Sequence, residues 1–387
     1  MTTPVWPFRP QHDLVESLEW MTDVMKAKRA EQRECLRVMP RIFYQCKYIL
    51  GDADYGAARE LARTVGGDSV LVPDWPNDAQ VPSFSAGTAS LPVDATFAPA
   101  YLSGAAALIW DSNARYEAVT VSGAGTGTIS ISAATMDHVN PSIVPLRLGT
   151  FTKAFDGERG PYDFSNAEAE FRCIYTEDLS TVSGGPGYPT YRGDQVITDP
   201  VEIINGAKES NVREVETVDS QVGPLYNYPI FATPNQSAVL GWTARNASDL
   251  WSRRAWLHSK KGKWKQFWVL SWNNDVQIAA DIAGGDGTIR IVDIGFASKY
   301  PNPTDLAIVA PDGGMWFVRV TGATPFGTGF ESLTLSAPFV GSVSLANISK
   351  TCKMTLSRLD SDRIDIQHLP GRQATIVAAT KEVPVYP

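Results

Sequence analysis

The feature that most limits the fold of this chain is a stretch of sequence that occurs twice. Residues 72–80 read VPDWPNDAQ, and residues 269–277 read VLSWNNDVQ. The Val, Trp, Asn, Asp and Gln of the first stretch recur at matching positions of the second. This pattern predicts that the same local structure forms at two places in the chain.

Three further pairs of matching segments follow the first pair in the same order. They are VDATFAPAY (93–101) with VDIGFASKY (292–300), EAVTVSGA (117–124) with FVRVTGA (317–323), and TISISA (128–133) with LTLSA (333–337). Two copies are too few for a solenoid, which needs at least three repeats to form a continuous core. The matches therefore favour two related globular domains in tandem, and 387 residues are enough for two or three domains.

The matches also set the expected domain boundaries. We expect a first β domain over residues 41–178 and a second domain, its repeat, over residues 223–387. Residues 179–222 begin with a Gly- and Pro-rich stretch and continue as charged, weakly periodic sequence. That composition predicts a linker or an extended arm. Residues 1–40 form an N-terminal arm ahead of the first repeat.

Inside each repeat, apolar and polar residues alternate with a period of two. Examples are EAVTVSG, GTISISA, GTIRIVDI and MWFVRVTG, which end at turn-forming residues. No helical stretch of crossover length separates successive strands, so the sheets should be antiparallel, in a sandwich or a partly closed barrel. The expected fold class is mainly β.

Residues 13–38 are the exception to this alternation. Leu14, Leu18, Met21 and Met25 recur there at helical spacing, which predicts a helix in the N-terminal arm. The arm is also more apolar than a free tail should be, and this implies a partner surface. We therefore expect contact with a neighbouring subunit from five side chains: Trp6, Phe8, Leu14, Leu18 and Trp20.

The repeated Trp-x-Asn-Asp group is the first candidate site. Its members are Trp75, Asn77 and Asp78 in the first copy and Trp272, Asn274 and Asp275 in the second. The recurrence of an aspartate suggests a duplicated acid site. A structural turn is favoured instead, because Asx side chains bond their own backbone while a Trp ring anchors the turn.

Other arrangements typical of enzymes are missing from the sequence. The glycines of SGAGTGTIS lead into a strand, whereas a dinucleotide-binding loop must begin a helix. None of the histidines has metal-ligand or triad spacing: His12, His138, His258 and His368. The cysteines have no C-x-x-C spacing, which predicts buried, reduced thiols, and a metal cluster would need all four together: Cys35, Cys46, Cys173 and Cys352. We expect no enzyme activity, no cofactor and no metal.

Charge limits the choice of partners. The net charge of −8 and the pI near 5.2 give no long-range attraction for nucleic acid or anionic membranes. The N-terminus lacks a secretory pattern and no apolar run is long enough to span a membrane. Residues 253–272 mix Lys and Arg with Trp and Phe, which favours a hairpin with SKKGK at its tip. Nucleic-acid contact or a charged protein interface are the alternatives for this stretch.

Three segments of the chain resemble tail proteins of long-tailed bacteriophages. The first contains Trp-x-x-x-Pro, Glu-x-Leu-Glu-Trp-x-Thr-Asp-Val, Glu-Gln-Arg and Pro-Arg, and its matching residues are Trp6, Pro10, Glu16, Leu18, Glu19, Trp20, Thr22, Asp23, Val24, Glu31, Gln32, Arg33, Pro40 and Arg41. The other two are RRAWLHSKKGKWKQFWVLSWNND and LSRLDSDRIDIQH. These motifs mark a family and do not form a chemical site.

The resemblance implies a structural protein of the tail tip or baseplate, close to the distal-tail and hub proteins. Its partners would be itself, as a homo-hexamer or alternatively a trimer, together with the tail tube protein and the tip proteins. It would be located in the virion after assembly in the host cytoplasm. The alternative from another class is a carbohydrate-binding protein with tandem β domains, in which Trp75 or Trp272 is an aromatic platform.

Overall fold

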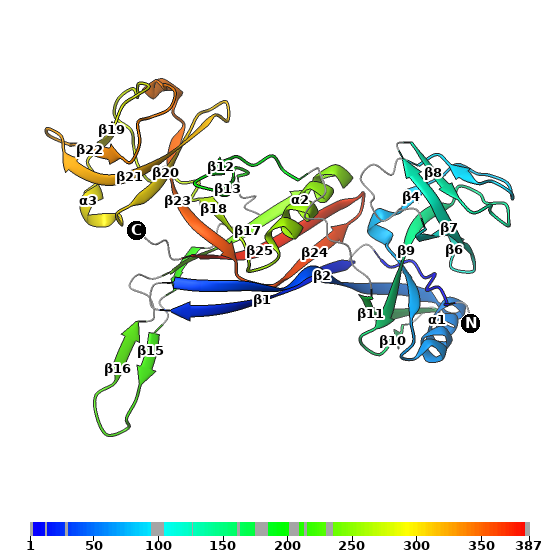
Figure 1. The fold of residues 1–387 in the computed structure, drawn as a ribbon. Coiled ribbons are helices and arrows are strands. Elements are labelled where there is room, and N and C mark those ends of the chain that lie inside the picture. Colours follow the sequence, from blue (N-terminus) through cyan, green and yellow to red (C-terminus); the bar gives the residue numbers. More distant parts are fainter. Residues whose placement is uncertain are drawn as a thin grey trace.

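The computed structural model describes residues 3–11, 14–27, 30–93, 104–125, 127–160, 163–174, 185–200, 209–212, 215–229 and 235–383. It is mainly β, as predicted (Figure 1). Strand pairs are antiparallel except β13 (Asp194–Ile197), which runs parallel to β18 (Gln266–Leu270). The sheets do not close into a barrel.

The described residues of the first half form one α-helix and a series of strands. Its elements are β1 (Val15–Ala27), β2 (Ala30–Gly51), α1 (Asp52–Val65), β3 (Val70–Pro73), the 3-10 helix η1 (Trp75–Asn77), β4 (Ala79–Gln80), β5 (Ser90–Leu91), β6 (Ala106–Ser112), β7 (Arg115–Gly125), β8 (Thr128–Ile131), β9 (Ser142–Phe151), β10 (Asp156–Arg159) and β11 (Phe164–Cys173).

The second half has a similar series. Its elements are β14 (Glu209–Val212), β17 (Asn235–Ala244), α2 (Ala247–Lys260), β18, β19 (Thr288–Val292), α3 (Phe296–Lys299), β20 (Thr304–Val309), β21 (Met315–Pro325), β22 (Phe330–Leu335), η3 (Leu345–Asn347), β23 (Lys350–Leu359), β24 (Arg363–Leu369) and β25 (Gln373–Glu382). Two short hairpins add β12 (Thr190–Tyr191) with β13, and β15 (Val215–Val218) with β16 (Tyr226–Pro229).

The same strand pairings occur in both halves. The ladders β1–β2, β2–β11, β10–β11 and β9–β11 correspond to β14–β17, β17–β25, β24–β25 and β23–β25. The ladders β3–β9, β6–β9, β6–β7, β7–β8 and β5–β8 correspond to β18–β23, β20–β23, β20–β21, β21–β22 and β19–β22. A register shift also recurs, between Val121 and Gly123 in β7 and between Val320 and Gly322 in β21.

One continuous sheet joins the halves. Its strand order is β10, β11, β2, β1, β24, β25, β17, β14, so four strands of the first half are followed by their four counterparts in the same order. Figure 1 shows its long strands side by side through the middle of the molecule, with a smaller lobe at each end. The largest apolar core lies along this sheet and draws residues from both halves, and each lobe has a core of its own.

The helix predicted for residues 13–38 is wrong, because these residues form β1 and part of β2. A spacing of four fits a strand as well as a helix, since it is a multiple of the strand period of two. Leu14, just before β1, and Leu18 and Trp20 within β1 are buried. The register shifts after Glu19, and Met21 beyond it is half exposed.

The predicted division into an arm, a linker and two domains also needs correction. β1 belongs to the N-terminal arm, yet it pairs with β2 of the first half and with β24 of the second half. The predicted linker contributes β13 and β14, which extend the sheets of the second half, while residues 175–184 and 201–208 lie outside the described residues. The arm and part of the linker are therefore built into the sheets.

The hairpin predicted within residues 253–272 is an α-helix followed by a strand. Helix α2 begins after Asn246, whose side chain accepts a hydrogen bond from the backbone N–H of Asp249 at 2.9 Å. It ends where Lys261 and Gly262 adopt positive φ values of 54° and 66°. Gly262 therefore belongs to a helix end instead of a hairpin tip, and β18 follows it.

Candidate functional site at the junction of the halves

The junction of the two halves is the pairing of β1 with β24. Its antiparallel register runs from Val15 opposite Gln367 to Glu19 opposite Arg363. The backbone N–H of His368 donates to the carbonyl of Leu14 at 2.9 Å, which continues the ladder by one more hydrogen bond. This ladder makes a single sheet from the two halves.

A buried charge cluster lies at this junction. The Glu16 carboxylate of β1 accepts hydrogen bonds from the Arg254 guanidinium of α2 and, at 2.9 Å, from Nε2 of the His368 imidazole of β24. Each of the three residues is at most 7% exposed. Burial by itself raises the pKa of the Glu16 carboxyl, but Arg254 and His368 lower it more, and the resulting pKa is about 2.

A second polar group lies beside this cluster. The Ser17 hydroxyl donates to Oδ1 of Asp365 at 2.6 Å and accepts from the Arg363 guanidinium at 2.9 Å. The Asp362 carboxylate accepts from the backbone N–H groups of Thr22 and Lys263, each at 2.9 Å. Asp362 thus ties β1 to the turn that follows α2, and the junction is held by side chains as well as by its ladder.

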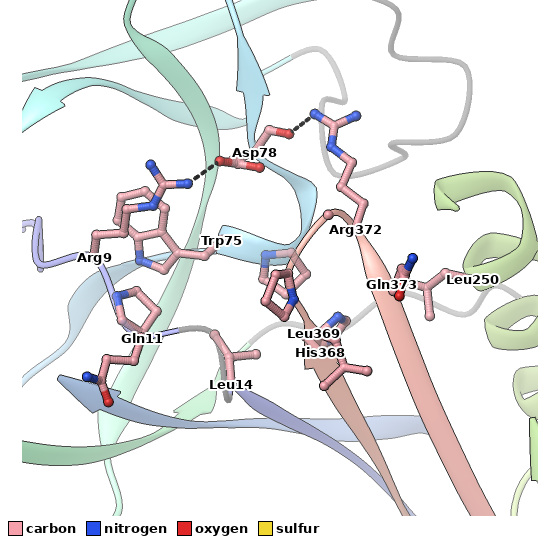
Figure 2. Close-up of a pocket in the computed structure, with 14 residues that line it drawn as sticks. Arg9, Gln11, Leu14, Trp75, Asp78, Leu250, His368, Leu369, Arg372 and Gln373 are labelled. Carbon is pink, nitrogen blue, oxygen red and sulfur yellow. Dashed lines mark hydrogen bonds and ion pairs between the residues drawn. The ribbon is translucent and has the colours of Figure 1, made fainter. Parts of the chain in front are cut away.

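A cavity of about 240 Å³ also lies between the halves (Figure 2). The Arg9 guanidinium lies 5.5 Å from the ring centroids of both Trp75 and Trp110, and it forms an ion pair of 3.1 Å with Asp78. From the second half, Arg372 donates to the Asp78 carbonyl oxygen. Burial raises the pKa of Asp78, although Arg9 and Arg372 oppose this effect. The turn that contains Trp75 and Asp78 therefore contacts both the N-terminal segment, through Arg9, and the β24–β25 hairpin, through Arg372.

The two Trp turns occupy equivalent points of the two halves. Asp74 and Ser271, which precede the tryptophans, each donate their backbone N–H to the long strand beside them, to Pro145 at 2.8 Å and to Lys353 at 3.0 Å. The turns themselves differ. Trp75 starts a 3-10 helix and is 8% exposed, whereas Trp272 has a φ of 58° and is partly exposed.

The Asn and Asp side chains of these turns bond to nearby parts of the chain. The Asn77 amide donates to Asp74 at 3.0 Å. In the second copy, Asn274 accepts from the backbone N–H of Thr351 at 2.9 Å, and Asp275 accepts from that of Lys353 at 2.7 Å. These contacts differ from the expected turn pattern, in which an Asx side chain bonds its own local backbone: Asn77 bonds the Asp74 side chain, and Asn274 and Asp275 bond the backbone of β23. Trp75 is too well buried to be the exposed platform of the carbohydrate-binding alternative.

The five side chains predicted to contact a neighbouring subunit are buried in the chain's own core. Their exposed fractions are 0% for Trp6, 3% for Phe8, 4% for Leu14, 0% for Leu18 and 1% for Trp20. The Trp6 indole N–H donates to the Tyr48 hydroxyl at 3.0 Å, and the Trp20 ring lies edge-on to the His258 ring. The same chain supplies the partner surface, so the inference of a subunit contact from the apolar character of these residues does not hold.

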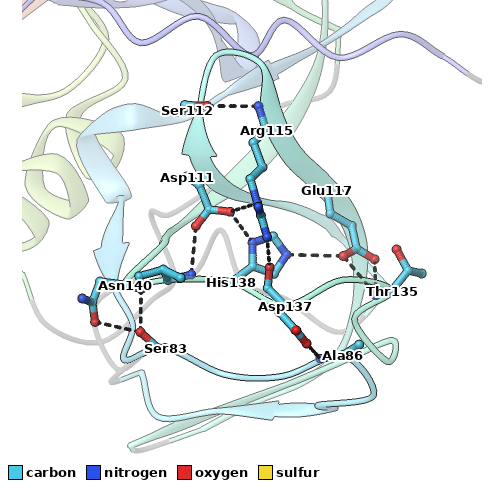
Figure 3. A network of polar contacts seen from close by, with 11 residues as sticks. Ser83, Ala86, Asp111, Ser112, Arg115, Glu117, Thr135, Asp137, His138 and Asn140 are labelled. Atoms are coloured by element: carbon cyan, nitrogen blue, oxygen red, sulfur yellow. Dashed lines mark hydrogen bonds and ion pairs between the residues drawn. The ribbon is translucent and has the colours of Figure 1, made fainter.

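Another buried histidine lies in the first lobe (Figure 3). Nδ1 of His138 is 2.7 Å from Asp111, and Nε2 is 3.4 Å from Glu117. The same Glu117 carboxylate accepts from the backbone N–H of Thr135 at 2.8 Å. These contacts hold the loop between β8 and β9 against β6 and β7. The partners of both His138 ring nitrogens are carboxylates, whereas a catalytic triad would place a Ser, Thr or Cys nucleophile beside one of them.

In the described ranges, the side chains that could bind a metal ion are scattered. No group of three or more His, Cys, Asp or Glu side chains within these ranges fits a metal ion. Cys46, Cys173 and Cys352 are buried and Cys35 is half-buried, and burial raises the pKa of the Cys46 and Cys173 thiols to about 12. None of the helices among these residues is long and apolar enough to cross a membrane.

The sequence interpretation did not assign the residues of the junction. A signal for them was present upstream of the first matching block, because Glu-Ser occurs at residues 16–17 and again at 209–210. Likewise, Arg59 follows Asp54 by the same number of residues as Arg254 follows Asp249. Extending the repeat toward the N-terminus would have placed these residues at corresponding positions. No protein-family model and no curated protein sequence matches the chain.

Proposed function

We propose that this protein is a structural component of a bacteriophage tail tip or baseplate, in a ring that joins the tail tube to the tip. The observation that carries the proposal is the continuous sheet, in which two like sets of four strands follow one another in the same order. A structural ring is built by repeating one unit side by side, and this chain already places two sets of four strands with the same pairing order side by side.

The resemblance to tail proteins supports the proposal from another direction. Its three segments are far apart in the sequence, yet each supplies one member of the buried charge cluster: Glu16, Arg254 and His368. The segments that resemble tail proteins thus converge on the place where one half joins the other. The tail tube and the neighbouring tip proteins are the proposed partners, and the virion is the proposed location.

The arrangement of the sheet bears on the number of chains in the ring. A ring of six chains, the first expectation from the sequence, would have one half lining the channel and the other half facing outward. Two halves that share one sheet lie side by side instead. We therefore favour the alternative of three chains, which places six like units in a single ring and matches a six-fold tail tube.

Exposed apolar side chains mark candidate contacts with other tail proteins. On the β1–β2 hairpin, beyond the junction, they are Met21, Met25, Leu36, Val38 and Met39. On the β15–β16 hairpin, which projects from the body in Figure 1, they are Val215, Val218, Leu225, Tyr226 and Tyr228. An isolated two-stranded hairpin is marginally stable in water, so a neighbouring protein would stabilise it.

The location is tested by immunogold labelling of purified virions of a phage that encodes the chain, with an antibody against the purified protein. We expect gold at the tail tip, and a nonsense mutant should produce tails without a complete tip. Gold on capsids alone, or normal tails from the mutant, would contradict the proposal. Glycan binding by the isolated monomer would favour the carbohydrate-binding alternative.

A further inference from the structure

The central sheet ends in two strands that correspond to the two strands of the junction. Among the described residues, β10 pairs with β11 alone and β14 pairs with β17 alone. In the repeat, β10 is the counterpart of β24 and β14 is the counterpart of β1. The junction joins β1 to β24, so the outer edges of the sheet are the same two kinds of edge that the chain joins in its middle.

The ladders fix which residues correspond. Phe171 pairs with the last residue of β9, and Thr380 pairs with the last residue of β23. From this point the β10–β11 and β24–β25 registers place Asp156 with Asp365 and Arg159 with His368. In the same way, the β14–β17 and β1–β2 registers place Glu209 with Glu16 and Ser210 with Ser17. Arg59 and Arg254 hold the same position in two helices of equal length.

The chemistry of the junction therefore recurs at the two free edges. At the junction, β1 carries Glu16 and Ser17, β24 carries Asp365 and His368, and α2 contributes Arg254. The edges have Glu209 and Ser210 on β14, Asp156 and Arg159 on β10, and Arg59 on α1. Glu, Ser, Asp and Arg recur at four of these positions and Arg159 stands where the junction has His368, whereas Arg363 of the junction has Ala154 at its corresponding position.

The junction residues and their counterparts at the edges differ in solvent exposure. Ser17, Arg254 and His368 are buried because the paired strand covers them. Their counterparts Ser210, Arg59 and Arg159 are exposed, as is Asp156. Charged residues on an edge strand usually discourage pairing with another chain. Here the same kinds of residue are accommodated inside the junction, so these charges suit one specific partner strand.

We propose that β14 of one chain adds to β10 of a second copy in the antiparallel register of the β1–β24 junction. Ser210 then lies opposite Asp156 of the neighbouring copy, as Ser17 lies opposite Asp365. Position 209 then lies opposite Gly157, as Glu16 lies opposite Ile366, and Arg59 and Arg159 are the counterparts of the Arg254 and His368 that bind Glu16. Each chain uses one edge as donor and the other as acceptor, which builds a head-to-tail assembly, and in the proposed ring of three chains this assembly closes on itself.

Cysteine crosslinking tests this register directly. Directly opposed residues of antiparallel strands have Cα atoms about 4.5–5.5 Å apart, within the range of a disulfide. The single variants Ser210→Cys and Asp156→Cys are mixed and oxidised mildly, and a dimer that contains one of each is expected. The matched control replaces Asp156→Cys by Glu158→Cys, two residues out of register, and the unsubstituted chain controls for the native cysteines.

Charge exchange gives an independent readout. Arg159→Glu is expected to lower the assembled fraction in native mass measurement at least tenfold, and adding Glu209→Arg to the same chain should restore it. Lys299→Glu makes the same change of charge on the exposed side of α3 and should leave assembly unchanged. Circular dichroism checks that each variant is folded.

Two results would overturn the inference: a folded chain that stays monomeric at its highest soluble concentration, and an oligomer in which Ser210→Cys and Asp156→Cys form no more crosslink than the control. The edge pairing itself depends only on this chain, whereas its place in a tail depends on the proposed function. Crosslinking of the purified protein together with missing label on virions would reject the tail location and keep the edge pairing.

Discussion

Replacing Glu16 by Gln should destabilise the fold in a manner that depends on pH. The Glu16 carboxyl has a pKa of about 2 in the folded chain and 4.5 as its reference value. A lowered pKa contributes stability above the unfolded-state pKa, and this contribution is lost as the pH falls through the folded-state pKa. The difference corresponds to about 3 kcal/mol of unfolding free energy at neutral pH.

Glu16→Gln also leaves the Arg254 guanidinium buried without its counter-charge. Breaking a buried pair in this way costs about 3–5 kcal/mol, which is the total loss we expect at pH 7. The loss should shrink by about 2 kcal/mol at pH 3, because the wild-type carboxyl has by then lost most of its own contribution. The two proteins should therefore become more alike in acid.

Urea unfolding, followed by circular dichroism at pH 7 and at pH 3, measures both quantities. The control is Glu168→Gln on β11, whose carboxylate is 58% exposed beside Lys47 and should matter by less than about 0.5 kcal/mol. A difference between wild type and Glu16→Gln that is the same at both pH values would refute the reasoning. It would mean that Glu16 is not held ionised by Arg254 and His368.

Four further substitutions test other parts of the fold. Trp6→Ala should cost about 3–5 kcal/mol in urea unfolding, because its ring is fully buried; an unchanged midpoint would show that residues 3–11 do not dock on the body. Trp75→Ala should cost a similar amount, whereas Trp272→Gly should cost about 1 kcal/mol or less, since Trp272 is partly exposed and Gly accepts its φ of 58°; equal losses in melting experiments would contradict this difference. Burial lowers the pKa of Lys260 to about 8, so the protein should gain stability as the pH rises from 8 to 10.5, and Lys260→Met should abolish this gain in denaturation at the two pH values.

Several features of the fold could be predicted from the sequence. The period-two alternation of apolar and polar residues predicted the mainly-β class, and both Trp turns lie at equivalent points of their ladders. The N-terminal segment was misread because spacings of four suit both a helix and a strand. Period alone does not separate the two, and the decisive information was pairing with β24, which lies more than 300 residues further along the chain.

The candidate site was harder to predict because its members depend on long-range register. Arg59 and Arg254 are the same residue type at the same position of two equal helices, yet one is exposed and the other is buried. The difference comes from β1, which covers the second helix site and has no described counterpart over the first. The local sequence around a helix does not show whether a distant strand will pack over it. The burial of Arg254 could therefore be predicted only from the strand order.

The contrast between edges and lobes indicates where two copies of a unit are free to diverge. The Trp turns differ, since Trp75 is covered by Arg9 while the Trp272 carbonyl accepts from Lys350 at 3.3 Å and its ring faces that same lysine. Between the junction strands and the outer edge strands, three aligned positions keep the same residue type: Glu16 and Glu209, Ser17 and Ser210, and Asp365 and Asp156. A unit that is joined repeatedly by one kind of contact must keep the chemistry of both its edges, because each edge has to fit every copy of the other. Its outer lobes have no such requirement, and they can each take a different neighbour.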